Sequence, residues 1–432
     1  MKRKACLLGD VCKFIDYRGK TPPKTNAGIP LITAKIIKHG AIQKPQEFIE
    51  ESFYDEWMRR GIPKRGDVIF TTEAPLGEVA QIKTDEKLAF AQRVIILEAD
   101  EIVLHSDYLF YALQDTVLKS RIEARSSGTT VFGIKASELK KVEIDLPAME
   151  TQKKIGEVLS KIDDKIELNQ QINKNLEEQA QAIFKAWFED YEPFGGEAPN
   201  EFISMTLGRV AEIKTDSISP SKNPNVKVEH YSIPAYDEKH FPVFETTDDI
   251  KSNKYIITDK SVIISKLNPD TKRIWRPMCL SEHPICSTEF IVYEARNPAH
   301  KDFLYSLIDS VRFYNYLCSH TTGSTNSRQR ATPSATLDFE FLLPSDEWIK
   351  KFCLIVTPIY DMISANLMEN QALANLRDAL LPRLMSGEID VSGIEILPND
   401  LAKAVADSRE RHNLHGPFDS AEEAVASMLK EG

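Results

Sequence analysis

Two long segments of the chain repeat one pattern of apolar positions, spaced alternately by four and three residues. Residues 139–188 match residues 337–385, with Pro147 on Pro344 at an offset of 197. Side chains at this spacing share one face of an α-helix, because the helix completes a turn about every 3.6 residues. The pattern therefore predicts two helices of about forty residues, each about 60 Å long.

Both predicted helices carry an apolar seam that is interrupted by two asparagines. The seam residues are Ile155, Leu159, Ile162, Ile166, Asn169, Asn173 and Leu176 in the first copy, and Phe352, Val356, Ile359, Ile363, Asn366, Asn370 and Leu373 in the second. Each seam needs a partner, and asparagines at seam positions commonly set the register by meeting each other. We expect the helices to pair as an intramolecular coiled coil, antiparallel because a whole domain separates them. Two unrelated amphipathic helices are the alternative.

The segments that precede the helices also correspond to each other. Short runs rich in β-branched residues, such as 66–71 and 260–265, alternate with turn residues and with helical patterns at 106–124 and 301–318. Each segment predicts an α+β domain of about 140 residues. The expected fold class is therefore α+β, with two globular domains, two long helices and a pseudo-twofold internal repeat. The predicted ranges are a globular domain at 1–147, a helix at 148–190, a linker and second globular domain at 191–344, a helix at 345–388 and a C-terminal extension at 389–432.

Composition narrows the class of protein further. The 432 residues include 65 acidic and 54 basic side chains, a net charge of −11, which argues weakly against indiscriminate nucleic-acid binding but not against local basic loops. No apolar stretch reaches the length of about 18 residues that a membrane-spanning helix needs. The six cysteines form no paired motif, and the first ten residues lack the apolar stretch of a signal peptide. We expect a reduced, cytoplasmic chain without a zinc site.

Familiar catalytic motifs are missing from the sequence. It has no phosphate-binding loop, no dinucleotide fingerprint, no zinc-protease helix and no nucleophile elbow. The Asn-Pro pairs at 223–224, 268–269 and 297–298 fall short of the motif of adenine methyltransferases. We predict no catalytic residue, no metal ligand and no cofactor in this chain. An enzyme with an unrecognised motif is the alternative, and activity of the purified chain alone would favour it.

Residues suited to DNA gather in the loops of both globular segments. Basic and hydroxyl side chains bind phosphates, while Arg, Asn and Gln recognise base edges. Each such residue alone is more often a solvated loop residue, but recurrence at matching places favours DNA binding. The candidates are Lys20, Thr21, Lys35, Thr71, Thr72, Arg93, Ser127 and Thr129 in the first domain, and Lys222, Tyr236, Lys266, Asn268, Arg273, Arg276, Thr322, Ser324, Asn326, Arg328 and Arg330 in the second.

At this point the chain resembles the specificity subunits of type I restriction-modification enzymes. The resemblance covers roughly residues 7–390 and is most specific at residues 146–155, 162–166 and 380–389. Two departures stand out. Gln152 has Ile349 at its repeat position, which puts a symmetric role for this glutamine in doubt, and Arg377 interrupts the second seam, where it would end tight packing.

The resemblance implies a non-catalytic subunit with two target-recognition domains, each of which binds one half of a split double-stranded DNA site. It implies that the helices act as a spacer and dock two methyltransferase subunits, which bind S-adenosylmethionine and methylate adenine. Restriction subunits would add ATP- and Mg²⁺-dependent translocation and cleavage. A coiled-coil scaffold that binds only proteins, without sequence-specific DNA recognition, is the alternative function.

Overall fold

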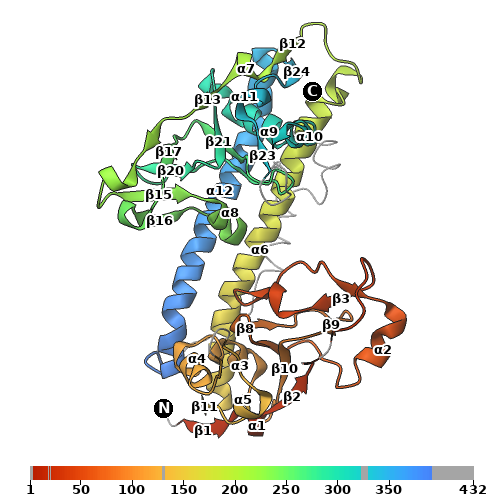
Figure 1. Cartoon of the computed structure of the whole chain (residues 1–432), viewed down its shortest axis with the longest axis vertical. Coiled ribbons are helices and arrows are strands. Elements are labelled where there is room, and N and C mark those ends of the chain that lie inside the picture. Colours follow the sequence, from red (N-terminus) through yellow and green to blue (C-terminus); the bar gives the residue numbers. More distant parts are fainter. Residues whose placement is uncertain (1–2, 18, 20, 129–131, 323–328, 392–432) are drawn as a thin grey trace. The chain divides into compact units, whose positions relative to one another are not determined.

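The structure is a computed structural model that describes residues 3–391, apart from residues 18, 20, 129–131 and 323–328 (Figure 1). The chain divides into two compact units of mixed helices and strands. Unit 1 runs to Lys165 and also contains the chain from Leu373 through the end of the last helix, and unit 2 runs from Ile166 to Ala372. No helix in the described ranges is long and apolar enough to cross a membrane.

Both predicted long helices are present. Helix α6 (Met149–Phe188) has 40 residues and helix α12 (Asp346–Ser386) has 41. Helix α6 begins two residues after Pro147, and α12 begins two residues after Pro344. A proline suits the position before a helix, because it has no backbone N–H to donate within the helix. Because the boundary between the units cuts both helices, each unit contains one part of α6 and one part of α12.

The globular part of unit 1 combines four small sheets with short helices. The strand orders are β1-β11, β2-β10-β7-β8, β6-β3-β9 and β4-β5. The elements are β1 (Lys4–Leu7), α1 (Leu8–Val11), β2 (Cys12–Asp16), β3 (Ile29–Ile32), β4 (Ile37–Lys38), β5 (Ala41–Ile42), β6 (Phe48–Ile49), α2 (Tyr54–Trp57), β7 (Val68–Thr72), β8 (Leu76–Gln81), β9 (Ala89–Phe90), β10 (Val94–Ala99), α3 (Ser106–Ala112), α4 (Thr116–Glu123), α5 (Ala136–Leu139) and β11 (Glu143–Leu146).

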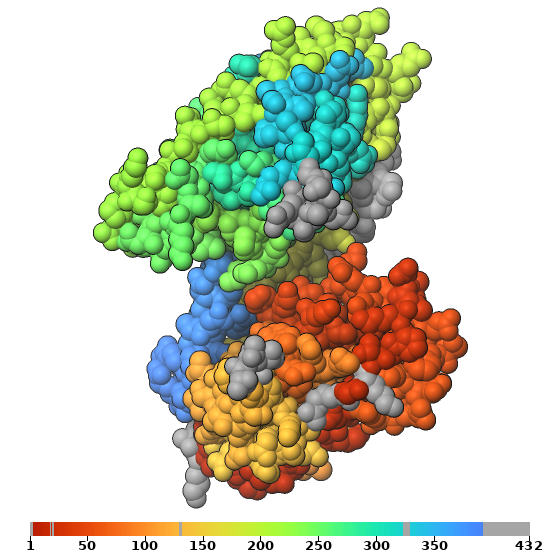
Figure 2. Space-filling view, in the orientation of Figure 1, coloured from red at the N-terminus to blue at the C-terminus, as the bar shows by residue number. Residues whose placement is uncertain are grey.

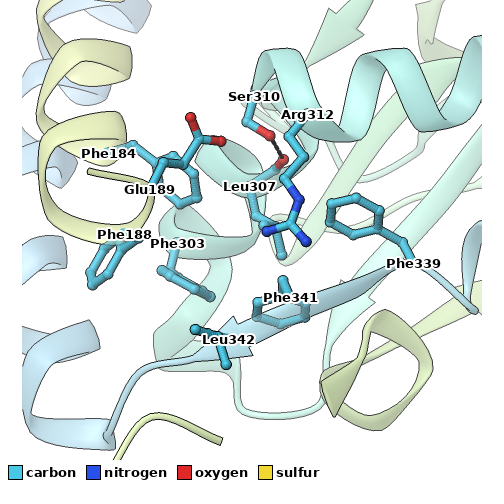
Figure 3. Close-up of a pocket in the computed structure, with 10 residues that line it drawn as sticks. All are labelled: Phe184, Phe188, Glu189, Phe303, Leu307, Ser310, Arg312, Phe339, Phe341 and Leu342. Carbon is cyan, nitrogen blue, oxygen red and sulfur yellow. Dashed lines mark hydrogen bonds between the residues drawn. The ribbon is translucent and has the colours of Figure 1, made fainter. Parts of the chain in front are cut away.

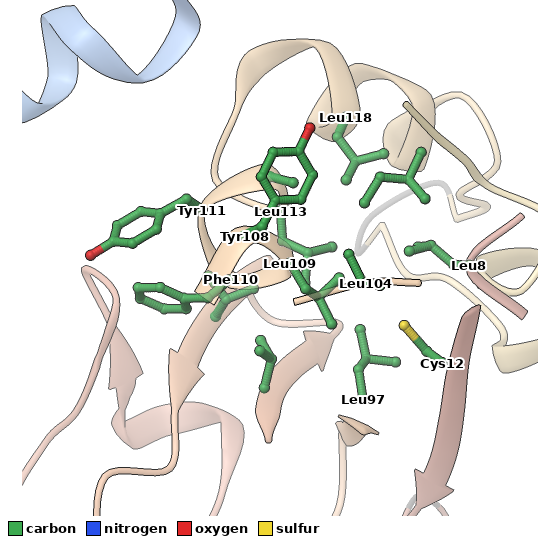
Figure 4. Close-up of a cluster of buried hydrophobic side chains, with 14 of the residues drawn as sticks. Leu8, Cys12, Leu97, Leu104, Tyr108, Leu109, Phe110, Tyr111, Leu113 and Leu118 are labelled. Carbon is green, nitrogen blue, oxygen red and sulfur yellow. The ribbon is translucent and has the colours of Figure 1, made fainter. Parts of the chain in front are cut away.

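One core of unit 1 joins its sheet to the long helices. Figure 4 shows one cluster of buried side chains that contains Tyr108 and Leu109 of α3 and Leu97 of β10. The same cluster contains Leu159 of α6 and Leu384 of α12. The globular part of unit 1 therefore shares its apolar core with both long helices.

The globular part of unit 2 repeats this plan with a larger second sheet. The strand orders are β12-β24, β13-β21-β18-β19, β14-β17-β20-β15-β16 and β22-β23. The elements are β12 (Ile203–Thr206), α7 (Leu207–Val210), β13 (Ala211–Lys214), β14 (Ser217–Ile218), β15 (Lys227–Tyr231), α8 (Ile233–Lys239), β16 (Val243–Thr246), β17 (Lys254–Ile256), β18 (Ser261–Ser265), β19 (Ile274–Trp275), β20 (Pro284–Ser287), β21 (Phe290–Ala295), α9 (Lys301–Asp309), α10 (Val311–Ser319), β22 (Thr321–Thr322), β23 (Arg330–Ala331), α11 (Pro333–Thr336) and β24 (Glu340–Leu343).

The two units share their central topology. The four-stranded sheets place equivalent strands in the same order, β2-β10-β7-β8 in unit 1 and β13-β21-β18-β19 in unit 2. In both units a glycine of the first short helix lies close to a segment later in the chain. A Cβ added at Gly9 would lie 2.9 Å from the Cβ of Lys140, and one added at Gly208 would lie 3.3 Å from the Cβ of Leu337. The units differ mainly in the second sheet, which has three strands in unit 1 and five in unit 2.

In unit 2 the seam asparagines of the two helices meet each other. Asn169 donates to the side-chain oxygen of Asn370 at 2.9 Å, and Asn366 donates to that of Asn173 at 2.7 Å. The two contacts are equivalent under the sequence repeat, since Asn169 corresponds to Asn366 and Asn173 to Asn370. The helix segments in this unit therefore run antiparallel, because a later residue of α6 faces an earlier residue of α12.

In unit 1 the segments of α6 and α12 are joined by hydrogen bonds between charged and polar side chains. Arg377 of α12 donates to Asp163 of α6 at 2.7 Å, and the Tyr111 hydroxyl of α3 donates to the same carboxylate at 2.7 Å. Burial beside Asp163 raises the pKa of the Tyr111 hydroxyl well above its ordinary value. Arg377 thus links the helices to the globular part of unit 1, which the sequence pattern did not predict.

Gln152 accounts for one of the two departures from the repeat. Its side chain is buried at the start of α6, donates to the carbonyls of Val103 and Pro147, and accepts from the N–H of His105. These bonds tie the helix start to the loop before α3. The equivalent Ile349 is buried in an apolar cluster of unit 2, so the two units fix their helix starts by different means.

The asparagine pairs predict a non-additive response to substitution. Asn173→Leu should lower the free energy of unfolding by about 1–3 kcal/mol, because the half-buried partner Asn366 loses the acceptor of its hydrogen bond. The double variant Asn173→Leu, Asn366→Leu should recover most of that loss, since both polar groups are then removed. Urea unfolding of the full chain measures both values. Equal and additive losses in the two single variants would show that the pair does not interact.

Candidate nucleic-acid interface

Five of the predicted DNA-binding residues lie outside the described residues and receive no structural account. They are Lys20, Thr129, Ser324, Asn326 and Arg328. The other candidates fall into two groups. One group gathers around a cluster of loops in each unit, and the other lies elsewhere on the globular parts.

Loop cluster 1 consists of residues 71–75, 91–93 and 132–134 of unit 1. The N–H of Thr72 donates to the carbonyl of Arg93 at 2.8 Å, and the N–H of Ile134 donates to the carbonyl of Thr72 at 3.0 Å. Gly133 pairs in addition with Glu73 as an isolated antiparallel bridge. The end of β7 therefore joins the turn before β10 to the segment before α5.

Loop cluster 2 consists of residues 265–269, 287–289 and 329–331 of unit 2, and its backbone pairing is the same. The N–H of Lys266 donates to the carbonyl of Glu289, and the N–H of Ala331 donates to the carbonyl of Lys266, both at 2.9 Å. Leu267 and Arg330 form the matching antiparallel bridge. The sequence predicted that these loops recur, and the structure shows that each unit assembles them around the end of one strand.

Both loop clusters also hold a left-handed residue at the equivalent place. Ala74 has φ = 48° and Asn268 has φ = 47°, and Arg93 in loop cluster 1 has φ = 72°. A residue other than glycine in this region costs on the order of 1 kcal/mol. Such conformations persist where the surrounding bonds fix them, and here the shared backbone pairing does so. The turns are therefore well-defined supports for the side chains beside them.

The hydroxyls at the ends of these strands stabilise the turns rather than face solvent. Thr71 and Thr72 are buried, and the Thr71 hydroxyl donates to the carbonyl of Pro75 at 2.7 Å. In unit 2 the hydroxyl of buried Ser265 donates to the carbonyl of Leu267 at 2.9 Å. The structure thus gives the side chains of Thr71 and Thr72 a supporting position behind the surface.

Each loop cluster carries one arginine at its surface, and both arginines are paired with a glutamate. Arg93 lies 3.1 Å from Glu73 through Nε. Arg330 donates through Nε and Nη2 to the two oxygens of Glu289 at 2.9 and 3.0 Å, and this pairing holds the pKa of the Glu289 carboxyl below its ordinary value. Neither glutamate was among the predicted residues, because cations, hydroxyls and amides, rather than carboxylates, are the side chains expected to contact DNA.

Two other predicted arginines are committed to internal ion pairs. Arg273 binds both oxygens of Asp237 at 2.6 and 2.9 Å. Arg276 binds Asp302 of α9 at 2.7 and 3.2 Å and Asp361 of α12 at 2.9 Å. Their guanidinium groups therefore connect structural elements within unit 2.

The Arg276–Asp361 contact has a counterpart in unit 1. Asp361 corresponds in the repeat to Asp164 of α6, and Asp164 pairs with Lys83 at 3.3 Å. Lys83 follows β8 and Arg276 follows β19, the equivalent edge strands of the two four-stranded sheets. In each unit a cation beyond the edge strand thus binds the aspartate at one repeat position of a long helix.

The remaining candidates do not form a single cluster. Thr21, Lys35, Ser127, Lys222 and Thr322 are exposed, and Lys266 and Asn268 are half-buried within loop cluster 2. Tyr236 packs edge-on against Trp275 with ring centroids 5.1 Å apart, and burial raises the pKa of its hydroxyl to about 12. Tyr236 therefore contributes to the core of unit 2.

One enclosed pocket of unit 2 is too small to hold a ligand. Five of the ten residues that line the pocket in Figure 3 are phenylalanines, with Arg312 and Glu189 beside them, and its free volume of about 10 Å³ leaves room for at most one water. Among the described residues, no group of histidines, cysteines and carboxylates could hold a metal ion. All six cysteines are free, and burial raises the pKa of the Cys12 thiol to about 12.

The ion pairs of Arg276 predict a structural rather than a surface role. Arg276→Ala should lower the free energy of unfolding by about 3 kcal/mol, because it leaves the buried carboxylate of Asp302 without its cation. Lys222→Ala, at an exposed lysine, should change it by less than about 0.5 kcal/mol. Urea unfolding separates the two variants, and equal stability of both would contradict the structural role.

Known proteins resemble this chain over most of its length. Residues 4–178 match the family described as type I restriction modification DNA specificity domain. The chain is 28% identical over 388 residues to the type I restriction enzyme MjaIX specificity subunit of Methanocaldococcus jannaschii, covering 84% of this chain and 87% of that protein. It is 25% identical over 405 residues to the HindI specificity subunit of Haemophilus influenzae, covering 76% and 87%.

A solved structure supports the fold. The type I restriction-modification S subunit from M. genitalium has a TM-score of 0.53 at 16% identity, over 89% of this chain and 96% of that chain. The sequence matches support the resemblance to specificity subunits that the helix motifs and the repeat predicted. The chain is therefore similar, over most of its length, to the specificity subunits of type I restriction-modification systems, and its residues 4–178 match their DNA specificity domain.

Proposed function

We propose that this chain binds a bipartite double-stranded DNA target and brings methyltransferase subunits to it. The observation that carries the proposal is the recurrence of one loop architecture in both units with different side chains. Thr72, Arg93 and Gly133 in loop cluster 1 correspond to Lys266, Glu289 and Arg330 in loop cluster 2. A constant backbone with variable side chains suits two sites that recognise two different sequences, since base edges are distinguished by side chains.

In this proposal residues 1–147 and 191–344 are the two target-recognition domains. The exposed Thr21, Lys35, Ser127, Lys222 and Thr322 bind phosphates, and the arginines and polar residues of the loop clusters contact base edges. The chain itself performs no chemistry. A methyltransferase partner that binds S-adenosylmethionine turns the target adenine out of the DNA stack, as enzymes that modify bases do. Restriction subunits would supply ATP- and Mg²⁺-dependent cleavage, and the assembly would act in the cytoplasm.

The long helices serve in this proposal as an antiparallel coiled-coil spacer between the two domains. Support comes from the clamps that fix each globular part to its helix segments, Lys83 to Asp164 in unit 1 and Arg276 to Asp361 in unit 2. Half-sites on DNA face one side of the duplex when they lie about one helical turn, or ~34–36 Å, apart. A spacer whose ends are fixed to the domains can hold such a spacing, whereas a flexible linker cannot.

The exposed face of α12 is the surface that we propose for partner docking. Leu354 is 77% exposed, and Met362 and Met368 are also exposed, within an arc of about 120° around the helix. The exposed residues of α6, such as Lys174 and Glu178, are instead polar. Part of α12, in blue, lies at the surface on the face that Figure 2 shows. Large apolar side chains in a row on an exposed helix suit burial by another protein chain.

The proposal predicts a split methylation motif that one domain alone can alter. Cells that express the chain with its methyltransferase should methylate adenine in a two-part sequence with a fixed gap, and cells with the methyltransferase alone should not. Arg330→Ala should relax the sequence of one half-site and leave the other unchanged, because Arg330 belongs to unit 2 only. Mapping of adenine methylation across the genome measures both effects.

Two outcomes would contradict this proposal. Equal relaxation of both half-sites in Arg330→Ala would show that the units do not recognise separate sequences. A stable complex with the methyltransferase that produces no new methylation would favour the alternative, a scaffold that binds proteins but not a DNA sequence.

Docking on α12 predicts a loss of the partner without a loss of fold. The double variant Leu354→Asp, Met362→Asp should reduce co-purification of the methyltransferase at least about tenfold, since each charge would be buried in the interface. Its melting temperature should stay close to that of the unchanged chain, because both side chains are exposed. Gln170→Asp, on the polar face of α6, is the matched control. Unchanged co-purification of the double variant would place the interface elsewhere.

A further inference from the structure

Both loop clusters present the same ion pair, but they build it from different residues. In unit 1 the arginine stands in the turn before β10, as Arg93, and its glutamate, Glu73, follows β7. In unit 2 the glutamate stands in the equivalent turn before β21, as Glu289, and the arginine comes from β23, as Arg330. The two turns are equivalent because each supplies the carbonyl that accepts the N–H of Thr72 or Lys266.

The exchange of positions shows which feature the two units have in common. No single residue is shared, since position 93 is basic and its counterpart at 289 is acidic. What recurs is an arginine held by a carboxylate beside the same strand end. Recurrence of a pair through unrelated residues indicates that the pair itself, rather than one ancestral side chain, has a use in these loops.

The pairs contribute little to stability. The side chains of Arg330 and Glu289 are 45% and 30% exposed, and those of Arg93 and Glu73 are 46% and 45% exposed. Ion pairs at such exposure add little to the free energy of folding, because water and salt screen them. Stability therefore does not account for the two pairs, and opening either of them costs the protein little.

The carboxylate of a glutamate can bind an arginine with the same geometry as the acceptor groups of DNA do. It offers two acceptor oxygens to the planar fork of a guanidinium, as a phosphate does, and guanine offers two acceptors on its major-groove edge. Glu289 occupies both Nε and Nη2 of Arg330, which are the donors that a bidentate contact with DNA would use. The arginine can therefore bind DNA in this way only after it leaves the glutamate.

We propose that Glu73 and Glu289 are specificity-determining residues that compete with DNA for Arg93 and Arg330. Each glutamate keeps its arginine from binding the phosphates of unrelated DNA and releases it where a matching half-site offers better acceptors. After release, the glutamate repels nearby phosphates, so a poorly matched duplex is bound less tightly than a neutral loop would bind it. This inference rests on the proposed function, because it assumes that these loops contact DNA.

The test uses the assembled complex with the methyltransferase and two duplexes. One duplex carries the mapped methylation site, and the other carries it with the half-site of unit 2 scrambled. Glu289→Gln should raise the affinity for the scrambled duplex about two- to fivefold, the size of effect that a surface ion pair exerts. The affinity for the matched duplex should change less, so discrimination falls.

Salt dependence distinguishes competition from a structural effect. The slope of log affinity against log salt concentration on the scrambled duplex should steepen by about 0.9 in Glu289→Gln, because one more cation contacts a phosphate. Glu282→Gln removes the same charge from an exposed position of unit 2 and should leave the slope unchanged. The double variant Glu289→Gln, Arg330→Gln should match Arg330→Gln alone, since the glutamate then has no arginine to withhold.

The outcomes distinguish failure of the proposed function from failure of the proposed competition. A parent complex that binds both duplexes equally would overturn the proposed function together with this inference. A parent complex that discriminates, combined with an unchanged slope in Glu289→Gln, would overturn the competition alone. Weaker binding of both duplexes, with a lower melting temperature, would show that Glu289 only supports the loop. Glu73→Gln should give the corresponding loss of discrimination at the other half-site.

Discussion

The two hydrogen bonds between seam asparagines in unit 2 are the interaction on which the rest of the structure depends. Burial of an amide is costly unless another group hydrogen-bonds to it, so buried Asn169 requires Asn370, and buried Asn173 requires Asn366. A shift of either helix by one turn would break both contacts at once. The asparagines therefore fix the register, while the apolar residues between them, such as Val356, supply burial that many registers could provide.

The helices, once their register is fixed, position the globular parts, and ion pairs and hydrogen bonds attach each globular part to its helix segments. Asp164 and Asp361 stand at one repeat position and each binds a cation from the edge of a sheet. Gln152 adds a further attachment in unit 1, where Asp163 of α6 also accepts hydrogen bonds from both Arg377 of α12 and Tyr111 of α3. Such attachments cost a protein flexibility and bring no chemistry of their own. They are useful where loops must be held at defined places, as recognition of a DNA sequence requires.

The loop clusters combine a constant backbone with interchangeable side chains. The left-handed residues Ala74 and Asn268 and the matching hydrogen bonds hold equivalent turns in both units. On this support, the side chain at position 93 is basic and that at position 289 is acidic. Specificity can therefore change by substitution at the loop surface without a change in the fold. If the proposed competition holds, restraint of Arg93 and Arg330 by their glutamates is as much a part of recognition as the arginines themselves.

The sequence by itself determined the helices, the repeat and the resemblance to a family. The seam spacing depends only on the period of the α-helix, and the recurrence of Asn169 and Asn173 as Asn366 and Asn370 is visible without a structure. The sequence also indicated which loops recur. It could not assign individual cations, because a loop arginine that binds DNA and one that binds an aspartate look alike in one dimension. Only the tertiary structure placed Asp302 and Asp361 beside Arg276, and Glu289 beside Arg330. The physical reason is that an ion pair acts over a few ångströms, and contacts between segments distant in sequence decide which charges come that close.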